Sequence, residues 1–354
     1  VGFFASNIVL AGQSLHGIAP AVPLPVGIVI GAVGSCVIGI IGYRCIHILN
    51  RIGTWVLGIG IMVGFGYIFT HLHTADFLTR GGFSFSGWLA TVSLAALWQI
   101  AFAPYVSDYS RYLPADVPVA ATFWTTYLGS TLGSSLSFIF GAVAVLATPV
   151  GLETMDAVKL ATGAIGPLML VLFLLSVISH NALNLYGAVM SVITLVQTFL
   201  WRWIPGSRSR ALLSVIVLIC CVVAAIFASA DFISHFIDLV LALLVVLVPW
   251  TAINLIDFYA IHKGNYDINS IFQVDGGIYG RYNPHALLAY AIGILVQIPF
   301  MNTPLYVGPV SAWFNGADLS WLVGLLVTSP LYYWLASRDS AWRRRQVGLK
   351  QAMD

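Results

Sequence analysis

Apolar stretches long enough to cross a lipid bilayer follow one another along the whole chain. A membrane-spanning helix needs about 20 mostly apolar residues. Stretches of this kind cover residues 1–17, 24–43, 52–71, 87–105, 118–148, 165–200, 211–230, 233–257, 284–301 and 320–337. Open strands leave backbone groups unsatisfied in lipid, whereas helices do not. The pattern therefore predicts an all-α polytopic membrane protein with ten visible spans.

Basic residues indicate how the spans are oriented and whether 165–200 is one helix or two. With one long helix there, alternate connections place thirteen basic residues on one side and two, Arg80 and Lys159, on the other. The thirteen are Arg44, Arg51, Arg111, Arg202, Arg208, Arg210, Lys263, Arg281, Arg338, Arg343, Arg344, Arg345 and Lys350. Cytoplasmic loops carry the excess of Lys and Arg. We therefore expect a single helix over 165–200 and a cytoplasmic C-terminus.

Composition excludes several classes of protein. Hydrophobic residues make up 59% of the 354 residues and charged residues only 8%, against about 25% charged in soluble domains. An ordinary cytosolic enzyme, a nucleic-acid binder or a disordered chain could not keep so much apolar surface from water. We expect one integral-membrane domain over 1–354 in a plasma (bacterial inner) membrane, with a basic cytoplasmic tail over about 338–354. The four cysteines form neither a metal-ligand spacing nor a disulfide framework.

The richest group of polar residues inside a span lies in the 165–200 stretch. It comprises Ser176, Ser179, His180, Asn181, Asn184 and Tyr186. Positions 176, 180 and 184 are four apart, and 181 and 184 are three apart, so most of the group shares one helix face. Any single member could serve as an interhelical hydrogen bond. Polar groups in a membrane interior are costly, however, and the group as a whole favours a ligand or ion site.

Two other spans carry candidate binding residues. Asn7 and Gln13 lie in the first span, and an amide offers both donors and acceptors to a neutral solute or to a neighbouring helix. Trp98 and Gln99 lie in the fourth span, before Pro104, which we expect to break or kink that helix. Discontinuous helices mark binding sites in transporters.

Charged pairs and enzyme motifs give little further indication of function. Asp108 and Arg111 are three apart and could pair as a structural latch or gate at the cytoplasmic end of the fourth span. His71 and His73 with Asp76 are weak evidence for a metal site. The chain lacks GxSxG, HExxH, Walker and Rossmann motifs. We therefore expect neither an enzyme nor a bound cofactor.

Three aspartates, Asp231, Asp238 and Asp257, lie at predicted span ends. Solvation is the default state for a carboxylate in that position. Asp238 lies slightly inside its span and is the only one of the three that we consider for proton handling.

Four motifs resemble a known family. They are SDYSRYLP after the tryptophan-bearing span, HNALNLYGA in the long polar span, NLIDFYAIHKGNYD followed by GGIYGRYN, and PFMNTPLYVGPVSAWFNGADLSW near the end. In this order they resemble the purine–cytosine permease branch of the nucleobase–cation symporter family, over essentially the whole chain. The resemblance implies a LeuT-like fold of twelve spans, ten of which form two inverted five-helix repeats. The ten spans here would be the third to the twelfth, so we expect two more before Val1, which begins inside an apolar run.

The resemblance also implies substrate-binding residues. The family's third span places an aromatic residue and, four positions later, an amide against the substrate, and Phe3 and Asn7 match them. The sixth span supplies a second aromatic residue, matched by Trp98, with Gln99 as the neighbouring candidate. The eighth span supplies a hydrogen-bonding asparagine, matched by Asn184.

The coupling ion stays open between sodium and a proton. Sodium-coupled members carry two adjacent hydroxyl side chains one turn before that asparagine, where this chain has Ile178 and Ser179. One hydroxyl is lost, although a backbone carbonyl could replace it. Proton coupling through His180 is the alternative, because histidine titrates near neutral pH.

The sequence as a whole predicts a secondary transporter that imports a nucleobase or a similar planar heterocycle with a cation. Its expected partners are that small solute and the lipid bilayer, with no nucleic acid and no obligate protein partner. The alternative is an integral-membrane channel or enzyme. A channel would need a repeated filter element, and none is visible; saturable, concentrative, cation-dependent uptake would distinguish a carrier from either.

Overall fold

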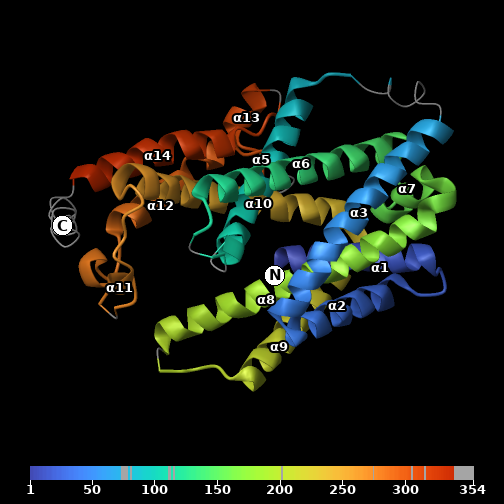
Figure 1. Cartoon of the computed structure of the whole chain (residues 1–354). Coiled ribbons are helices and arrows are strands. Elements are labelled where there is room, and N and C mark those ends of the chain that lie inside the picture. The colour runs from blue at the N-terminus through green and yellow to red at the C-terminus, as the bar shows by residue number, and fades with distance from the viewer. Residues whose placement is uncertain are drawn as a thin grey trace. The chain divides into compact units, whose positions relative to one another are not determined.

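The computed structural model describes residues 1–72, 79, 82–110, 113–114, 116–200, 202–273, 275–303, 306–314 and 316–338. In these ranges the regular structure is helical, and the only strand-like pairing is one isolated bridge between Asn302 and Val307 (Figure 1). By length and composition, 6 helical stretches of the described residues are apolar enough to cross a membrane. One of them, 207–261, contains two successive helices. The all-helical prediction is therefore confirmed.

The long helices follow the predicted stretches closely. They are α1 (Gly2–Ile18), α2 (Leu24–Ile41), α3 (Tyr43–His71), α5 (Phe85–Ser110), α6 (Val119–Leu146), α8 (Gly166–Phe199), α9 (Ser207–Ala228), α10 (Phe232–Leu255), α12 (Pro284–Leu295) and α14 (Ser320–Arg338). Shorter elements are α7 (Thr154–Ala161), η1 (Gly163–Ile165), η2 (Ser229–Asp231), α11 (Ile268–Ile271), η4 (Gly277–Tyr279), η5 (Ile298–Phe300), α13 (Pro309–Trp313) and the π-helical turn η3 (Ile256–Ile261).

Three helices test specific expectations. The stretch 165–200 does form one continuous helix, α8, of 34 residues. Helix α3 begins at Tyr43, well before the predicted residue 52, so Asn50 belongs to a helix. Helix α5 continues through Pro104 to Ser110 and is not interrupted there, contrary to one of the two outcomes that we expected. A proline removes one backbone hydrogen bond, and the flanking turns of α5 tolerate that loss.

The chain forms two compact units. The first comprises residues 1–82 and 123–236, and the second comprises residues 83–122 and 237–354. In the first unit, α1 packs against α2, α7, α8 and α9, and α3 crosses α8 (Figure 1). In the second unit, α12 packs against α14, which also contacts η3 and η5.

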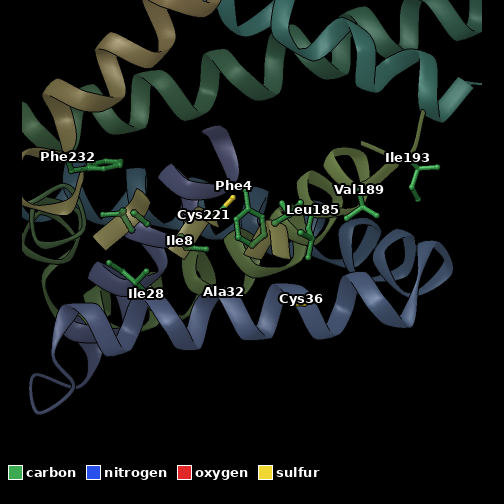
Figure 2. Packing of buried hydrophobic residues seen from close by; sticks show 13 residues of the cluster. Phe4, Ile8, Ile28, Ala32, Cys36, Leu185, Val189, Ile193, Cys221 and Phe232 are labelled. Carbon is green, nitrogen blue, oxygen red and sulfur yellow. The ribbon is translucent and has the colours of Figure 1, made fainter. Parts of the chain in front are cut away.

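Two apolar clusters hold the first unit together. One joins α1, α2, α8 and α9 around Phe4 and Ile8, which face Ile28 and Leu185 (Figure 2). The other joins α3, α6, α7 and α8 around Phe140. Because α1 and α8 share the first cluster, polar side chains that are buried between them have apolar neighbours.

Close packing of α1 on α2 depends on glycine. A Cβ atom built on Gly27 would lie 2.9 Å from the backbone oxygen of Gly12, and one on Gly12 would lie 2.9 Å from the backbone nitrogen of Ile28. No side chain fits between two backbones at this distance. Small residues at helix interfaces allow such an approach in membrane proteins.

Candidate functional site

Three asparagine side chains from α1 and α8 form one hydrogen-bonded group in the first unit. Asn181 Oδ1 accepts from Asn7 Nδ2 at 3.3 Å and from Asn184 Nδ2 at 3.0 Å. Asn181 Nδ2 donates to the backbone oxygen of Phe4 at 3.1 Å. Residues 181 and 184, and likewise 4 and 7, are three apart, so each pair shares a helix face. We call Asn7, Asn181 and Asn184 the amide triad.

Burial of the triad is uneven. Asn181 is fully buried and Asn184 is nearly so, whereas Asn7 is partly exposed. The apolar cluster around Phe4 and Leu185 surrounds the two buried amides. Hydrogen bonds in such an environment are electrostatically strong, and a lost partner is correspondingly costly. The triad is therefore a rigid polar group with one amide, that of Asn7, at its accessible end.

Among the residues predicted to bind substrate, three lie in the first unit. Phe3 and Asn7 lie on α1 one turn apart, and Asn184 lies on α8 at the other end of the triad. Trp98 and Gln99 lie on α5, in the second unit, where 43% of the Trp98 surface is exposed. Stacking of a substrate between Phe3 and Trp98 stays a prediction.

The residues predicted for the cation differ in their surroundings. Ser179 is buried, and its hydroxyl donates to Asn50 Oδ1 on α3 at 3.0 Å. The His180 side chain is exposed, so it does not share the buried surroundings of Ser179 and Asn181. The sequence did not predict Asn50 as a site residue, because the predicted span began at residue 52 and left Asn50 outside the membrane.

The predicted latch and metal site lie largely outside the described residues. Asp108 belongs to the last turns of α5, but its side chain and the whole of Arg111 are not described. His73 and Asp76 also lie outside the described ranges, whereas the His71 ring stacks on Tyr67 at 4.1 Å between centroids. Among the described residues, no group of three or more His, Cys, Asp or Glu side chains could hold a metal ion.

A second polar group, in the second unit, corrects one expectation. Asp257 is not simply solvated: its Oδ1 accepts from the Tyr332 hydroxyl at 2.6 Å and its Oδ2 from the Tyr266 hydroxyl at 2.7 Å. Asp257 Oδ2 also lies 3.1 Å from His262 Nδ1. Burial, together with the hydrogen bond to Asp257, raises the pKa of Tyr266. Two tyrosines thus bond to one aspartate, and no spacing rule in the sequence joins Asp257 to Tyr332.

A third polar group fastens α7 to the end of α1. The amide of the buried Gln13 donates to Glu153 Oε2 at 2.6 Å, and Lys159 Nζ donates to the backbone oxygen of Gly17 at 2.7 Å. Gln13 thus joins two elements, as the alternative reading of that residue predicted.

The chain is similar in sequence to known permeases. The chain is 34% identical over 338 residues to the putative purine-cytosine permease YxlA of Bacillus subtilis (strain 168), covering 94% of this chain and 72% of that protein. It is 23% identical over 366 residues to the purine-cytosine permease fcyB of Emericella nidulans, covering 94% and 67%.

A solved structure has the same fold. Mhp1, a nucleobase-cation-symport-1 family transporter in a closed conformation with bromovinylhydantoin bound, superimposes with a TM-score of 0.68 at 18% identity, over 98% of this chain and 76% of that one. Residues 2–324 match the family model described as permease for cytosine/purines, uracil, thiamine, allantoin. With that match over most of its length, the chain belongs to this permease family.

Proposed function

We propose that this chain is the greater part of a secondary active transporter that imports a nucleobase or a related planar heterocycle together with a cation. The observation that carries the proposal is the amide triad: neutral hydrogen-bonding groups in an apolar interior of a permease-family protein. A charged substrate would call for a charged partner. An uncharged heterocycle needs only donors and acceptors along its edge.

Specific residues would perform the recognition. Asn7 and Asn184 would bind the edge of the heterocycle, and Phe3 would stack on its face, since aromatic rings favour offset stacking. Trp98, with Gln99 as its neighbour, would cover the opposite face. Alternating access would come from movement of one helical repeat against the other around the site. Asp108 and Arg111 would act as a gate at the cytoplasmic end of α5.

Sodium is the coupling ion that we propose. The Ser179 hydroxyl donates a hydrogen bond to Asn50 Oδ1, which leaves the lone pairs of the hydroxyl oxygen for a hard cation. The side chain of His180, the residue for the proton alternative, is exposed, whereas Ser179 is buried. Sodium-independent uptake driven by a pH gradient would favour the proton instead.

The charge asymmetry of the connections supports the orientation. Thirteen basic residues against two favour a cytoplasmic C-terminus in a plasma (bacterial inner) membrane. No protein partner is needed for the mechanism.

Uptake measurements test the proposal. The full-length gene product is expressed in cells that lack their own nucleobase carriers, and accumulation of labelled cytosine, uracil, hypoxanthine and allantoin is followed with and without a sodium gradient. We expect saturable, concentrative uptake of at least one compound. Asn184→Ala should abolish it at an unchanged amount of carrier in the membrane. No uptake of any of the four by well-expressed carrier would refute the proposal.

A further inference from the structure

We infer that Asn181 is a positioning residue that sets which atoms of the neighbouring amides face the substrate, so that Asn7 presents its carbonyl oxygen and the carrier selects heterocycles that donate N–H. This inference rests on the proposed function. It concerns a residue that would not itself contact the substrate, because its Oδ1 and Nδ2 already bond to Asn7, Asn184 and the backbone oxygen of Phe4.

The orientation follows from one backbone carbonyl. The oxygen of Phe4 can only accept a hydrogen bond, so the group of Asn181 that faces it, at 3.1 Å, must be the Nδ2 amine. The planar amide then turns Oδ1 the opposite way. An amide oxygen can only accept, and therefore both neighbours must direct their amine groups toward it.

The consequence differs between the two neighbours. Asn184 uses its Nδ2 on Asn181 at 3.0 Å within the buried interior. Asn7 uses its Nδ2 on the same oxygen at 3.3 Å but is only partly buried. The Asn7 amine is thereby directed inward, and its Oδ1 is the atom on the side away from Asn181. Without Asn181, the Asn7 amide could rotate and offer either group.

The substrate class follows from hydrogen-bond complementarity. A fixed carbonyl oxygen favours a ligand that places an N–H against α1, and an exocyclic amino group is the donor that we propose. A ligand with only acceptors at that edge would face oxygen with oxygen, and a ligand with nothing there would leave the Asn7 oxygen unpaired. Sites that hydrogen-bond a polar group reject analogues without it more strongly than apolar sites discriminate by size.

Matched pairs of competitors test the inference. Uptake of the labelled nucleobase that the wild-type carrier imports is inhibited with cytosine or 2-pyrimidinone, and with adenine or purine; within each pair, the second compound lacks only the amino group. We expect the amino compound to compete better in at least one pair for the wild type. If neither amino compound competes better, the inference is overturned, whereas absence of any uptake would overturn the proposed function instead.

Variants connect this preference with Asn181. Asn181→Leu keeps the approximate shape and removes all its hydrogen bonds, and Asn181→Ala removes the side chain. We expect the wild-type preference to shrink about five- to tenfold, as for the loss of one net hydrogen bond. Ser35→Ala, which removes an equally buried hydroxyl bonded only within α2, is the control and should keep the preference.

Loss of affinity alone would indicate a merely structural role. An equal weakening of both members of each pair, or an unchanged preference at normal membrane abundance, would therefore refute the role of Asn181. Asn7→Leu covers the case in which the buried variants do not reach the membrane, because position 7 is partly exposed. It should abolish the same preference; if it does not, the Asn7 oxygen does not read the substrate.

Discussion

Two side chains on one turn of α8, Ser179 and Asn181, bond to different helices of the first unit. Ser179 bonds outward to α3 through Asn50, whereas Asn181 bonds to α1 through Phe4 and Asn7. Adjacent positions on a helix face different neighbours, so one short segment could hold the proposed cation and the proposed solute at once. The sequence identifies such residues by type, but their partners depend on which helix packs against which face.

The Asn50–Ser179 hydrogen bond yields a prediction at the residue scale. Asn50→Leu removes the acceptor that orients the Ser179 hydroxyl, so the sodium concentration for half-maximal uptake should rise about fivefold, the equivalent of about 1 kcal/mol. Thr54→Val, on the same helix, removes a hydroxyl that bonds only to the backbone oxygen of residue 50 and serves as the control. An identical sodium dependence in both variants and the wild type would contradict a cation at Ser179.

At the scale of elements, the α1–α2 contact tests how far packing depends on glycine. Gly27→Val inserts a side chain where a Cβ alone would lie 2.9 Å from the Gly12 oxygen, so α1 must move and carry Asn7 with it. We expect loss of folded carrier, since overpacking costs about 1–3 kcal/mol or more where backbone is the obstacle. Gly58→Val on α3, where a Cβ meets nothing within 4 Å, should leave the amount of folded carrier, measured by size-exclusion chromatography, unchanged. Equal behaviour of the two variants would disprove this packing argument.

The side chain of Gln297 supplies a hydrogen bond that Pro249 removes from the backbone of α10. Pro249 has no N–H for the backbone oxygen of Val245, and Gln297 Nε2 donates to that oxygen at 2.9 Å. The same amine donates to the backbone oxygen of Gly293 at 2.9 Å, where α12 passes into the 3₁₀ turn η5. Gln297 is fully buried, and it therefore satisfies two carbonyls that no water reaches.

A double-mutant cycle measures this compensation. Gln297→Leu leaves both carbonyls unsatisfied, which should lower the free energy of unfolding by about 1–3 kcal/mol for each. Adding Pro249→Ala restores an N–H for Val245, so the double variant should regain part of the loss, with a coupling of about 0.5–3 kcal/mol. Thermal unfolding of the purified carrier provides the measurement. Strictly additive effects would mean that Gln297 does not compensate for Pro249.

The helices show where sequence patterns succeed and where they stop. Hydrophobicity left open whether 165–200 is one helix or two, and the placement of basic residues predicted the single helix that α8 forms. Hydrophobicity placed the start of α3 too late, because Arg44 and Arg51 were assigned to a loop although the helix continues through both. The pairing of Asp257 with Tyr332, 75 positions apart, has no local signal at all. Sequence patterns predict which face of a helix is apolar. They do not predict polar partners far apart in the sequence, because those depend on how the helices pack.

Over the whole molecule, charged residues are scarce, and one carboxylate accepts hydrogen bonds from two separate segments of the second unit. Only 13 residues are acidic, and Asp257 at η3 binds Tyr266 of the following connection and Tyr332 of α14. Asn283, which caps the start of α12, donates to the Tyr332 hydroxyl at 3.3 Å. Four parts of the second unit thus meet at one group of hydroxyl and carboxylate oxygens.

Two adjacent tyrosines allow a controlled test of this group. Tyr332 is 1% exposed and Tyr333 is 49% exposed on the same helix. Tyr332→Phe removes a hydrogen bond to a carboxylate, worth about 1.5–3 kcal/mol, so the Tm of the purified carrier should fall by several degrees, at roughly 2–4 °C per kcal/mol. Tyr333→Phe should leave the Tm unchanged; equal Tm values for the two variants would show that the bond to Asp257 contributes nothing.

The pH dependence of this group follows from the raised pKa of Tyr266. A raised pKa means that folding favours the neutral phenol, so its contribution is complete below the ordinary tyrosine pKa of about 10 and is lost only as the pH rises beyond it. Tyr266→Phe should therefore lower the Tm by the same amount at any pH between about 6 and 9. A destabilisation that varied within this range would contradict this prediction, because the neutral Tyr266 phenol does not change its charge there. The stability contributed by the hydrogen bonds to Asp257 would then depend on pH, instead of joining α14 to the end of α10 equally at every pH in this range.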